Sequence, residues 1–293
     1  MDDATMLDEL RPTAQRLVDR HLSMAKEWYP HDLVEWRSPP APGSAGPLPD
    51  GVASALFVNV LTEDNLPYYF ASIDGLFGRD GAWGYWTRRW TAEEGRHSIV
   101  LRDYLIMSGH IDPVNLERAR MAQVTGGVSP QVATVADAFV YLALQELATR
   151  IAHHNTGKAL PDAEGYAVMK RVAADENLHY LFYRDLVSAA LEIDPSGMTE
   201  AITRQVLSFE MPGTGIPDFA LHAKAIARAG IYDLAVHHDA ILRPVVLGHW
   251  DLAARQGLTP SAEDARNRLL HFISRLGRAS ARAKEPRVAS RNG

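Results

Sequence analysis

WTAEEGRHSIVLRDYL, residues 90–105, shares one short phrase with VAADENLHYLFYRDL, residues 172–186. In both stretches two acidic residues stand side by side, and a histidine follows the second of them by three positions, at 94–97 and at 176–179. No other glutamate in the sequence is followed by a histidine at that spacing. The repetition of Glu-x-x-His inside two apolar, helix-like runs therefore points to a chemical reason that both copies share.

The spacing of apolar residues along the chain is mostly three to four, as in amphipathic helices, and strand-like alternation is scarce. The sequence therefore predicts an almost all-α protein. The Pro/Gly-rich segment 37–51 is predicted to be an extended surface loop. Helices are expected at residues 6–27 (with Pro12 in the first turn), 52–76, 82–107, 130–156 and 162–192, with shorter helices in the remainder.

The composition sets limits on function and location. The 293-residue chain has a formal net charge of −6 and 46% hydrophobic residues, enough for one large core and without the basic surplus of a nucleic-acid binder. No apolar stretch reaches membrane length and the N-terminus is acidic, so we expect a soluble, cytoplasmic protein without membrane insertion. The absence of cysteine excludes disulfides and cysteine-held clusters. One domain is expected over residues 1–283, followed by a disordered basic tail at 284–293.

The Glu-x-x-His spacing brings the two side chains of each phrase together. Positions i and i+3 of a helix lie on one face, about one turn apart. Glu94 and His97 can therefore reach one metal ion together, and so can Glu176 and His179.

Two further helical stretches each carry a single glutamate inside an apolar stripe. Glu63 shares a predicted face with Leu56 and Val60, and Glu146 shares one with Leu142. A buried, ionised carboxylate without a partner costs several kcal/mol. No basic residue stands in either stripe, so a metal ion is the most economical partner for both glutamates.

The four helices together predict a dinuclear metal site. One Glu from each of two helices and a Glu-x-x-His from each of two others is the pattern of ferritin-like, di-iron or di-manganese four-helix bundles. Carboxylate and imidazole ligands suit iron or manganese. The fold expected is an all-α, ferritin-like four-helix bundle elaborated by additional helices. The expected ligands are Glu63, Glu94, His97, Glu146, Glu176 and His179.

The acids that precede each phrase are expected to orient the ligand histidines. A metal-bound histidine usually donates its other ring N–H to a carboxylate. Because the two helices face each other in such a bundle, Asp175 is assigned to His97 and Glu93 to His179. Trp28 is a candidate to extend the first of these pairs toward the surface as an electron route.

Other residues near the phrases have simpler explanations. Thr149 lies one turn beyond Glu146 and is a candidate catalytic residue, although an isolated threonine more often bonds its own helix backbone. His153 and His154 are expected to be exposed or polar core residues rather than ligands. The tryptophans of the first phrase helix are expected to serve only in core contacts: Trp83, Trp86 and Trp90.

Several motifs in the chain resemble those of the soluble acyl-acyl carrier protein (acyl-ACP) desaturases, especially their actinobacterial branch. The similarity spans about Arg16 to Val246. It rests on HLSMAKEWYPHD, LTEDNLPYY, DGAWGYWTRRWTAEEGRH, LRDYL, QELATRIAHHNTGK and ADENLHYLFYRD.

The resemblance implies the same six ligands, now as ligands of two iron ions. It also implies that Thr149 is the threonine on the dioxygen side of the site, and that Trp28, His97 and Asp175 form a chain. A homodimer, ferredoxin as electron donor, dioxygen as co-substrate and an acyl chain tethered to acyl carrier protein are further implied. The expected activity is insertion of a double bond into that acyl chain.

Two other functions stay open on the sequence alone. The first is a di-iron oxygenase that hydroxylates a carrier-tethered acyl or amino-acyl substrate. The second is a ferritin-like protein that binds or oxidises iron without acting on an acyl chain. The apolar interior and the additional helices expected for this chain favour an acyl substrate over iron storage.

Overall fold

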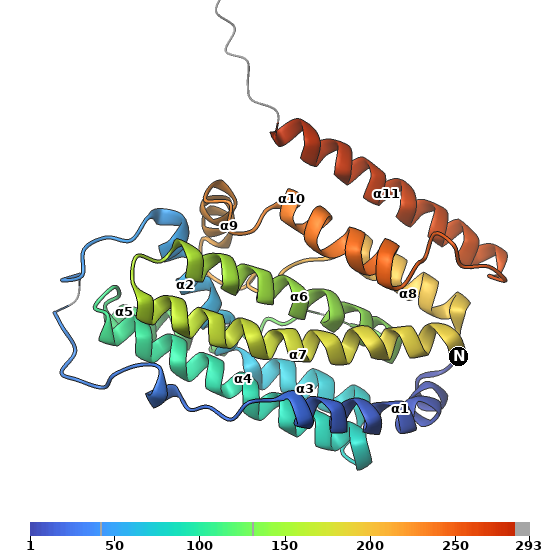
Figure 1. Cartoon of the computed structure of the whole chain (residues 1–293), viewed down its shortest axis with the longest axis horizontal. Helices are drawn as coiled ribbons and strands as arrows, with labels where there is room; N and C mark the ends of the chain where they lie inside the picture. The colour runs from blue at the N-terminus through green and yellow to red at the C-terminus, as the bar shows by residue number, and fades with distance from the viewer. Residues whose placement is uncertain (42, 131, 285–293) are drawn as a thin grey trace, which may run out of the picture.

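The computed structural model describes residues 1–41, 43–130 and 132–284, and within these residues every regular element is a helix (Figure 1). The all-α prediction is therefore confirmed. The expected tail at 284–293 lies outside the described residues, apart from Lys284 at the end of the last helix. No described helix is both long enough and apolar enough to cross a membrane.

Long helices form the centre of the molecule, with α6 and α7 running side by side along it (Figure 1). Helix α4 packs against α7, and the pair α2 and α3 packs against α4. Their bounds are α2 Asp50–Glu63, α3 Leu66–Phe77, α4 Gly81–Met107, α6 Val135–Ala159 and α7 Ala163–Ile193.

The remaining helices surround this bundle. Helix α1 lies along α7 and α4, and α11 covers α8 on another side (Figure 1). A π-helical segment, η2, contains Pro244 and was not anticipated. The bounds are α1 Asp3–Met24, η1 Pro30–Asp32, α5 Pro113–Gly126, α8 Pro195–Leu207, α9 Phe219–Arg228, α10 Leu234–Val236, η2 His237–His249 and α11 Pro260–Lys284.

Side-chain caps set where the helices begin. Thr134 accepts a hydrogen bond from the backbone of Asp137, so α6 begins after it and not at the predicted residue 130. Asp162 caps α7 in the same way, close to the predicted start. Asp2 caps α1, which places Pro12 in the interior of that helix and not in its first turn as predicted.

The helix predicted at 52–76 is instead two helices. Pro67 has no N–H to donate to the carbonyl of Glu63, so an uninterrupted helix would lose a hydrogen bond there. Asn65, with φ −80° and ψ 5°, makes the turn between α2 and α3. Glu63 therefore ends α2, and the chain direction changes directly after this candidate ligand.

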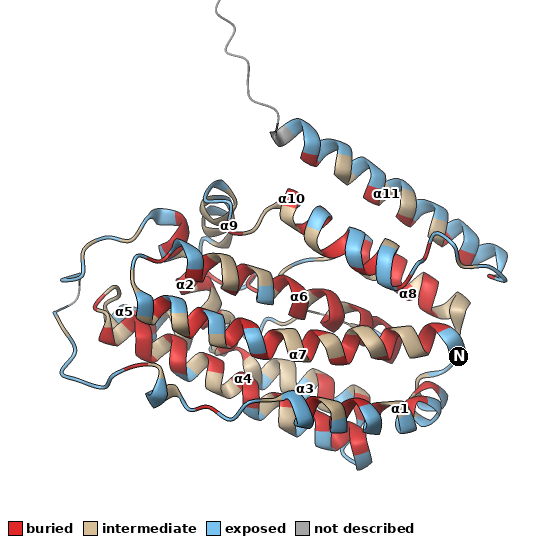
Figure 2. Ribbon diagram, in the orientation of Figure 1, coloured by how far each residue is buried: buried red, intermediate tan, exposed pale blue. Residues whose placement is uncertain are grey.

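Two buried hydrophobic clusters flank the polar phrases. Figure 2 shows the buried residues along the central helices α4, α6 and α7. Along α4, Trp90 belongs to one cluster and Val100 to the other, with the first Glu-x-x-His between them. Along α7, Val172 and Tyr180 bracket the second Glu-x-x-His in the same manner. Apolar side chains on both sides therefore hold the acids and histidines in place and keep water away from them.

Candidate metal centre

The six predicted ligands come from α2, α4, α6 and α7 and lie together in the bundle. All six are buried, with at most 8% of any residue exposed. They form two groups, in each of which one ligand atom per residue lies within 4.8 Å of the others. The groups are Glu63, Glu94, His97 and Glu176, and Glu94, Glu146, Glu176 and His179.

The atoms that face this centre fit a metal ion. Glu94 Oε1, Glu146 Oε2 and His179 Nδ1 are buried, and none makes a well-directed hydrogen bond among the described residues, although His179 Nδ1 lies 2.8 Å from Glu94 Oε1. Buried polar atoms are rarely left unpaired in folded proteins, because each costs free energy. Glu94 and Glu176 belong to both groups, so these two carboxylates would be shared if the centre held two ions.

His97 connects the centre to α1 and the segment that follows it. Its Nδ1 lies 3.2 Å from Glu94 Oε2 and 3.5 Å from Glu176 Oε1. Its Nε2 lies 3.5 Å from Asp175 Oδ2, and that same oxygen accepts a 2.7 Å hydrogen bond from the Trp28 indole N–H. The structure therefore brings Asp175 next to both His97 and Trp28, and the electron route through them stays a prediction.

Two arginines cover Trp28. The guanidinium carbon of Arg96 lies 4.8 Å from the indole centroid, and that of Arg171 lies 5.8 Å from it. Both arginines also pair with Asp175. The carboxylate behind His97 is therefore surrounded by cationic and N–H groups, which favour its ionised form.

His179 is held from the opposite side. Its Nδ1 lies 2.8 Å from Glu94 Oε1 and 3.6 Å from Glu146 Oε2. Its Nε2 lies 2.9 Å from Glu93 Oε2, which is the predicted pairing of Glu93 with His179. His21 of α1 reaches the same Glu93 oxygen at 3.0 Å, a contact that the sequence did not suggest.

His21 could have been found from the pattern of α1. It continues a buried stripe that includes Ala14, Leu17 and Val18. A histidine at the end of an apolar stripe needs a polar partner, and Glu93 supplies it. Glu93 also pairs with Arg89 at 2.5 Å, one turn earlier on α4.

His153 is part of the centre. It is buried, and its Nε2 lies 3.3 Å from Glu63 Oε1 and 3.6 Å from Glu176 Oε1. Of the two outcomes expected for His153, exposure is wrong and the polar core position is right. The sequence could have indicated this position, because His153 follows Thr149 by one turn of α6.

Trp90 does more than pack in the core, contrary to the prediction. Its indole N–H donates a 3.0 Å hydrogen bond to Glu146 Oε1. Glu146 Oε2 then remains the oxygen that faces the centre. The neighbouring Thr149 hydroxyl lies 3.1 Å from Glu176 Oε2 and 3.1 Å from the carbonyl oxygens of Gln145 and Glu146.

Burial and hydrogen bonding shift the pKa values of the acids in opposite directions. Burial raises the pKa of Glu63 to about 7, against the lowering effect of its hydrogen bond with His153. Burial also acts on Glu93, but hydrogen bonds from His179 and His21 outweigh it and lower the pKa of that carboxyl. Hydrogen bonds to Glu176 and Glu63 overcome the effect of burial on His153 and raise its pKa to about 9.

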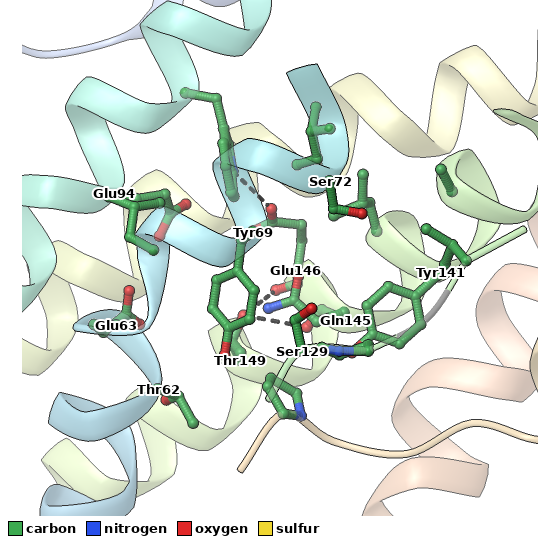
Figure 3. Close-up of a pocket in the computed structure, with 18 residues that line it drawn as sticks. Thr62, Glu63, Tyr69, Ser72, Glu94, Ser129, Tyr141, Gln145, Glu146 and Thr149 are labelled. Atoms are coloured by element: carbon green, nitrogen blue, oxygen red, sulfur yellow. Dashed lines mark hydrogen bonds between the residues drawn. The ribbon is translucent and has the colours of Figure 1, made fainter. Parts of the chain in front are cut away.

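A cavity of about 70 Å³ opens beside Glu63, Glu94 and Glu146 (Figure 3). Its wall comes from α2, α3, α4 and α6 and from two loop segments around Pro130 and Pro212. The Thr149 side chain also lines it. A ligand in this cavity would therefore lie next to the carboxylates and be partly shielded from bulk water.

Comparison with known proteins identifies the family. The family model described as fatty acid desaturase matches residues 2–292. DesA1 of Mycobacterium tuberculosis, described as a candidate acyl-ACP desaturase, is 39% identical over 293 residues, covering 94% of this chain and 86% of DesA1. The chain therefore belongs to this fatty acid desaturase family.

Plant relatives and a solved structure agree with that placement. The chloroplastic stearoyl-ACP 9-desaturase 6 of Arabidopsis thaliana is 33% identical over 257 residues, covering 81% of this chain and 65% of the plant protein. The X-ray structure of DesA2 from M. tuberculosis, described as a candidate acyl-ACP desaturase, matches with a TM-score of 0.72 at 24% identity. It covers 89% of this chain and 99% of DesA2. This structural likeness supports the fold.

Proposed function

We propose that this chain is a dioxygen-dependent desaturase that introduces a double bond into an acyl chain carried on acyl carrier protein. The observation that carries the proposal is the pair of buried carboxylate–imidazole groups beside a cavity. The chain belongs to the fatty acid desaturase family, and its relatives DesA1 and the Arabidopsis protein are named as acyl-ACP desaturases.

The proposed cofactor is a pair of iron ions, because carboxylate oxygens and imidazole nitrogens in this ratio suit iron. When bound, the ions supply the dioxygen chemistry that removes two hydrogens from adjacent methylene carbons. The proposed ligands are Glu63, Glu94, His97, Glu146, Glu176 and His179.

The chain's own residues prepare the ligands. Glu93 is hydrogen-bonded to His179 Nε2, and Asp175 lies 3.5 Å from His97 Nε2. Both carboxylates are therefore placed to favour the tautomer that leaves the Nδ1 lone pair directed at the centre. The Trp90 hydrogen bond fixes the rotation of Glu146. These partners hold the ligand set in place before a metal ion arrives.

Thr149 is proposed as the catalytic hydroxyl. It lines the cavity and contacts Glu176, so it stands between the substrate space and the metal centre. A hydroxyl in this position can hold or pass on a proton at Oγ.

Reduction of dioxygen to two water molecules takes four electrons, and removal of two hydrogens from the acyl chain supplies two, so two electrons must come from outside. The chain has no cysteine to hold an electron-transfer cluster of its own. We propose ferredoxin as the donor, with Trp28 and Asp175 as the route toward His97. We also propose the homodimer that the family resemblance implies and the cytoplasmic location expected from the sequence.

Mass spectrometry of the carrier protein tests the function. Iron-loaded protein is incubated with acyl-ACP, dioxygen, ferredoxin and its reductase. Loss of two hydrogens from the acyl chain supports desaturation, whereas gain of one oxygen atom would show hydroxylation. An unchanged acyl mass across a range of chain lengths, with iron oxidised all the same, would replace the proposal with an iron-binding function.

A further inference from the structure

Each of the two single glutamates of the centre has one oxygen near a histidine of its own ligand group. Glu146 Oε2 lies 3.6 Å from His179 Nδ1, and Glu63 Oε2 lies 3.9 Å from His97 Nδ1. The other oxygen of Glu146 accepts a 3.0 Å hydrogen bond from the Trp90 indole N–H. By analogy, a donor is expected beside the remaining oxygen of Glu63, Oε1.

His153 occupies that place. Its Nε2 lies 3.3 Å from Glu63 Oε1 and 3.6 Å from Glu176 Oε1, and only 1% of its side chain is exposed. The contact with Glu63 is not well directed, but neither ring nitrogen makes another hydrogen bond among the described residues. An ionised carboxylate only accepts hydrogen bonds, so the ring nitrogen that faces two of them carries the hydrogen. Glu63 Oε1 is therefore the nearest acceptor for this buried N–H.

Glu63 is the ligand that most needs such support. It is the last residue of α2, and the chain turns at Asn65 directly after it. It is also the most exposed of the six, at 8%, whereas none of the others exceeds 6%. Helix ends fray more readily than helix interiors. A hydrogen bond from the interior of α6 restricts both the rotation of Glu63 and the movement of its helix end.

The same face of α6 also contacts the shared carboxylate, Glu176. Thr149 and His153 stand one turn apart on this helix. The Thr149 hydroxyl lies 3.1 Å from Glu176 Oε2, whereas His153 Nε2 lies 3.6 Å from Oε1. Glu176 therefore keeps a partner on α6 without His153, and the shorter contact of His153 is the one with Glu63. Loss of His153 should affect Glu63 more than Glu176, and so one ligand group more than the other.

We propose that His153 is a positioning residue that donates Nε2–H to Glu63 and keeps this ligand directed at the ion it shares with His97. His153 lies outside both ligand groups, so this N–H is not replaced by a metal ion. The inference rests on the proposed function, because it takes both groups to hold iron. Each single glutamate is then held by a ring N–H from another helix, Glu63 by His153 and Glu146 by Trp90.

Iron binding tests the assignment without turnover. Mössbauer spectroscopy of the protein loaded anaerobically with ferrous iron distinguishes the two ions, and competition with a chelator gives their affinities. We expect His153→Leu to weaken the binding of one ion by about 10- to 100-fold, as is usual when a ligand loses its hydrogen-bond partner. The other ion should stay bound. His153→Gln keeps an N–H donor on the side chain and should restore most of the lost binding.

Two further variants serve as comparisons. His154→Leu changes the next residue of α6, a half-buried histidine that lines a separate groove, and should leave both ions bound. Trp90→Phe removes the N–H that holds Glu146 and should weaken the other ion. Weakening of the same ion by His153→Leu and Trp90→Phe would overturn the assignment, because the two rings would then not act through different glutamates.

The outcomes separate the inference from the proposed function. Equal loss of both ions in His153→Leu, or a loss in His153→Gln as large as that in His153→Leu, overturns the inference. An unmodified protein that binds no iron overturns both. An acyl chain of unchanged mass, with one ion weakened as expected, overturns only the proposed function.

Circular dichroism verifies that the variants fold. If His153→Leu is unfolded, His153→Phe takes its place with the same expectation. If both are unfolded, His153→Gln decides alone, since an amide replaces a hydrogen-bond donor but not an imidazole ligand. Two bound ions in that variant support the positioning role, and one bound ion overturns it.

Discussion

His97 and His179 occupy equivalent places in the doubled phrase, yet the groups behind them differ. The His97 arm continues through Asp175 to Trp28, which lies beneath two arginines. The His179 arm continues through Glu93 to His21, whose ring stacks at 5.8 Å on His179 itself. On the first arm two partly exposed arginines cover the end residue, Trp28, whereas on the second arm the end residue, His21, is buried and the partly exposed arginine, Arg89, pairs with Glu93 instead.

The difference shows which part of a site a local phrase can determine. Glu-x-x-His sets the direction of each Nδ1, because both residues lie on one helix face. The group at the far end of each arm comes from a different part of the chain, α1 for His21 and the segment after α1 for Trp28. We therefore expect the two arms to resemble each other in metal binding and to differ in electron delivery.

Removal of a shared ligand should have the largest effect. Glu176→Ala deletes a carboxylate that belongs to both ligand groups, so we expect iron content to fall from about two atoms per chain to nearly none. Glu146→Ala affects only one group and should leave part of the iron bound. Metal analysis after anaerobic loading measures this, with circular dichroism to verify helix content. Glu9→Ala on the exposed face of α1 is the matched control.

Retention of full iron by Glu176→Ala would contradict the two-group arrangement. An equal loss in Glu146→Ala and Glu176→Ala would instead indicate that the ions bind only as a pair.

The stabilisation that iron confers should increase with pH. The pKa of Glu63 is raised from 4.5 to about 7, and that of His153 from 6.5 to about 9, so the metal-free site holds protons in this range. A group whose pKa is higher in the folded than in the unfolded protein stabilises the metal-free fold at pH values below its pKa in the unfolded protein. This stabilisation is lost as the pH rises through the pKa of the group in the folded protein. Iron must displace these protons, so the increase in Tm on iron loading should be larger at about pH 8.5 than at about pH 6.

Calorimetry of the iron-loaded and metal-free protein across this interval measures the difference. The comparison with His153→Phe isolates the contribution of the histidine. A Tm increase that is constant over the interval would mean that the centre binds iron without releasing protons.

Changes to the acids behind the histidines should weaken iron binding by about 10- to 100-fold, which is usual for hydrogen-bond partners of metal ligands. Glu93→Gln should cost more than Asp175→Asn. Glu93 holds His179 and His21 with the same oxygen, and an amide oxygen supports two such bonds less well. In Asp175→Asn the amide oxygen can still accept from Trp28. Competition with a chelator gives both affinities, and the reverse order would mean that the arms are not organised as described.

Much of the centre follows from sequence because it depends on helix periodicity. Spacing on one helix face predicts all six candidate ligands, and the structure brings those residues together. The same rule places His21 in the buried stripe of α1, but it does not identify Glu93 as the partner of His21, because the two residues stand on different helices.

The break between α2 and α3 and the cavity wall are harder to predict. Pro67 could signal the break, but a proline can also stand inside a helix, as Pro12 does in α1. The cavity joins residues from separate elements, such as Ser72 and Pro212, and their proximity depends on tertiary contacts that no local pattern contains.

Trp28→Phe should separate the two arms by electron delivery. The phenyl ring cannot donate to Asp175, but it preserves most of the buried volume, so iron content should be unchanged. We expect reduction of the site by ferredoxin to slow by about tenfold, equivalent to roughly 1.4 kcal/mol in activation free energy. His21→Phe on the other arm should leave this rate unchanged. Stopped-flow absorbance measures both, and equal slowing in the two variants would remove the distinction between the arms.

The smallest effect is expected at the one position where the two phrases differ in backbone freedom. Gly95 follows Glu94 in the first phrase, where the second has Asn177. A methyl group on Gly95 would meet only Leu66 Cδ2, at 4.0 Å, which is an ordinary contact. Since glycine inside a helix is less stable than alanine by about 1 kcal/mol, Gly95→Ala should raise Tm by roughly 2–4 °C and leave iron content unchanged. A lower Tm, or loss of iron, would mean that α4 needs a flexible residue beside its ligand, whereas α7 does not.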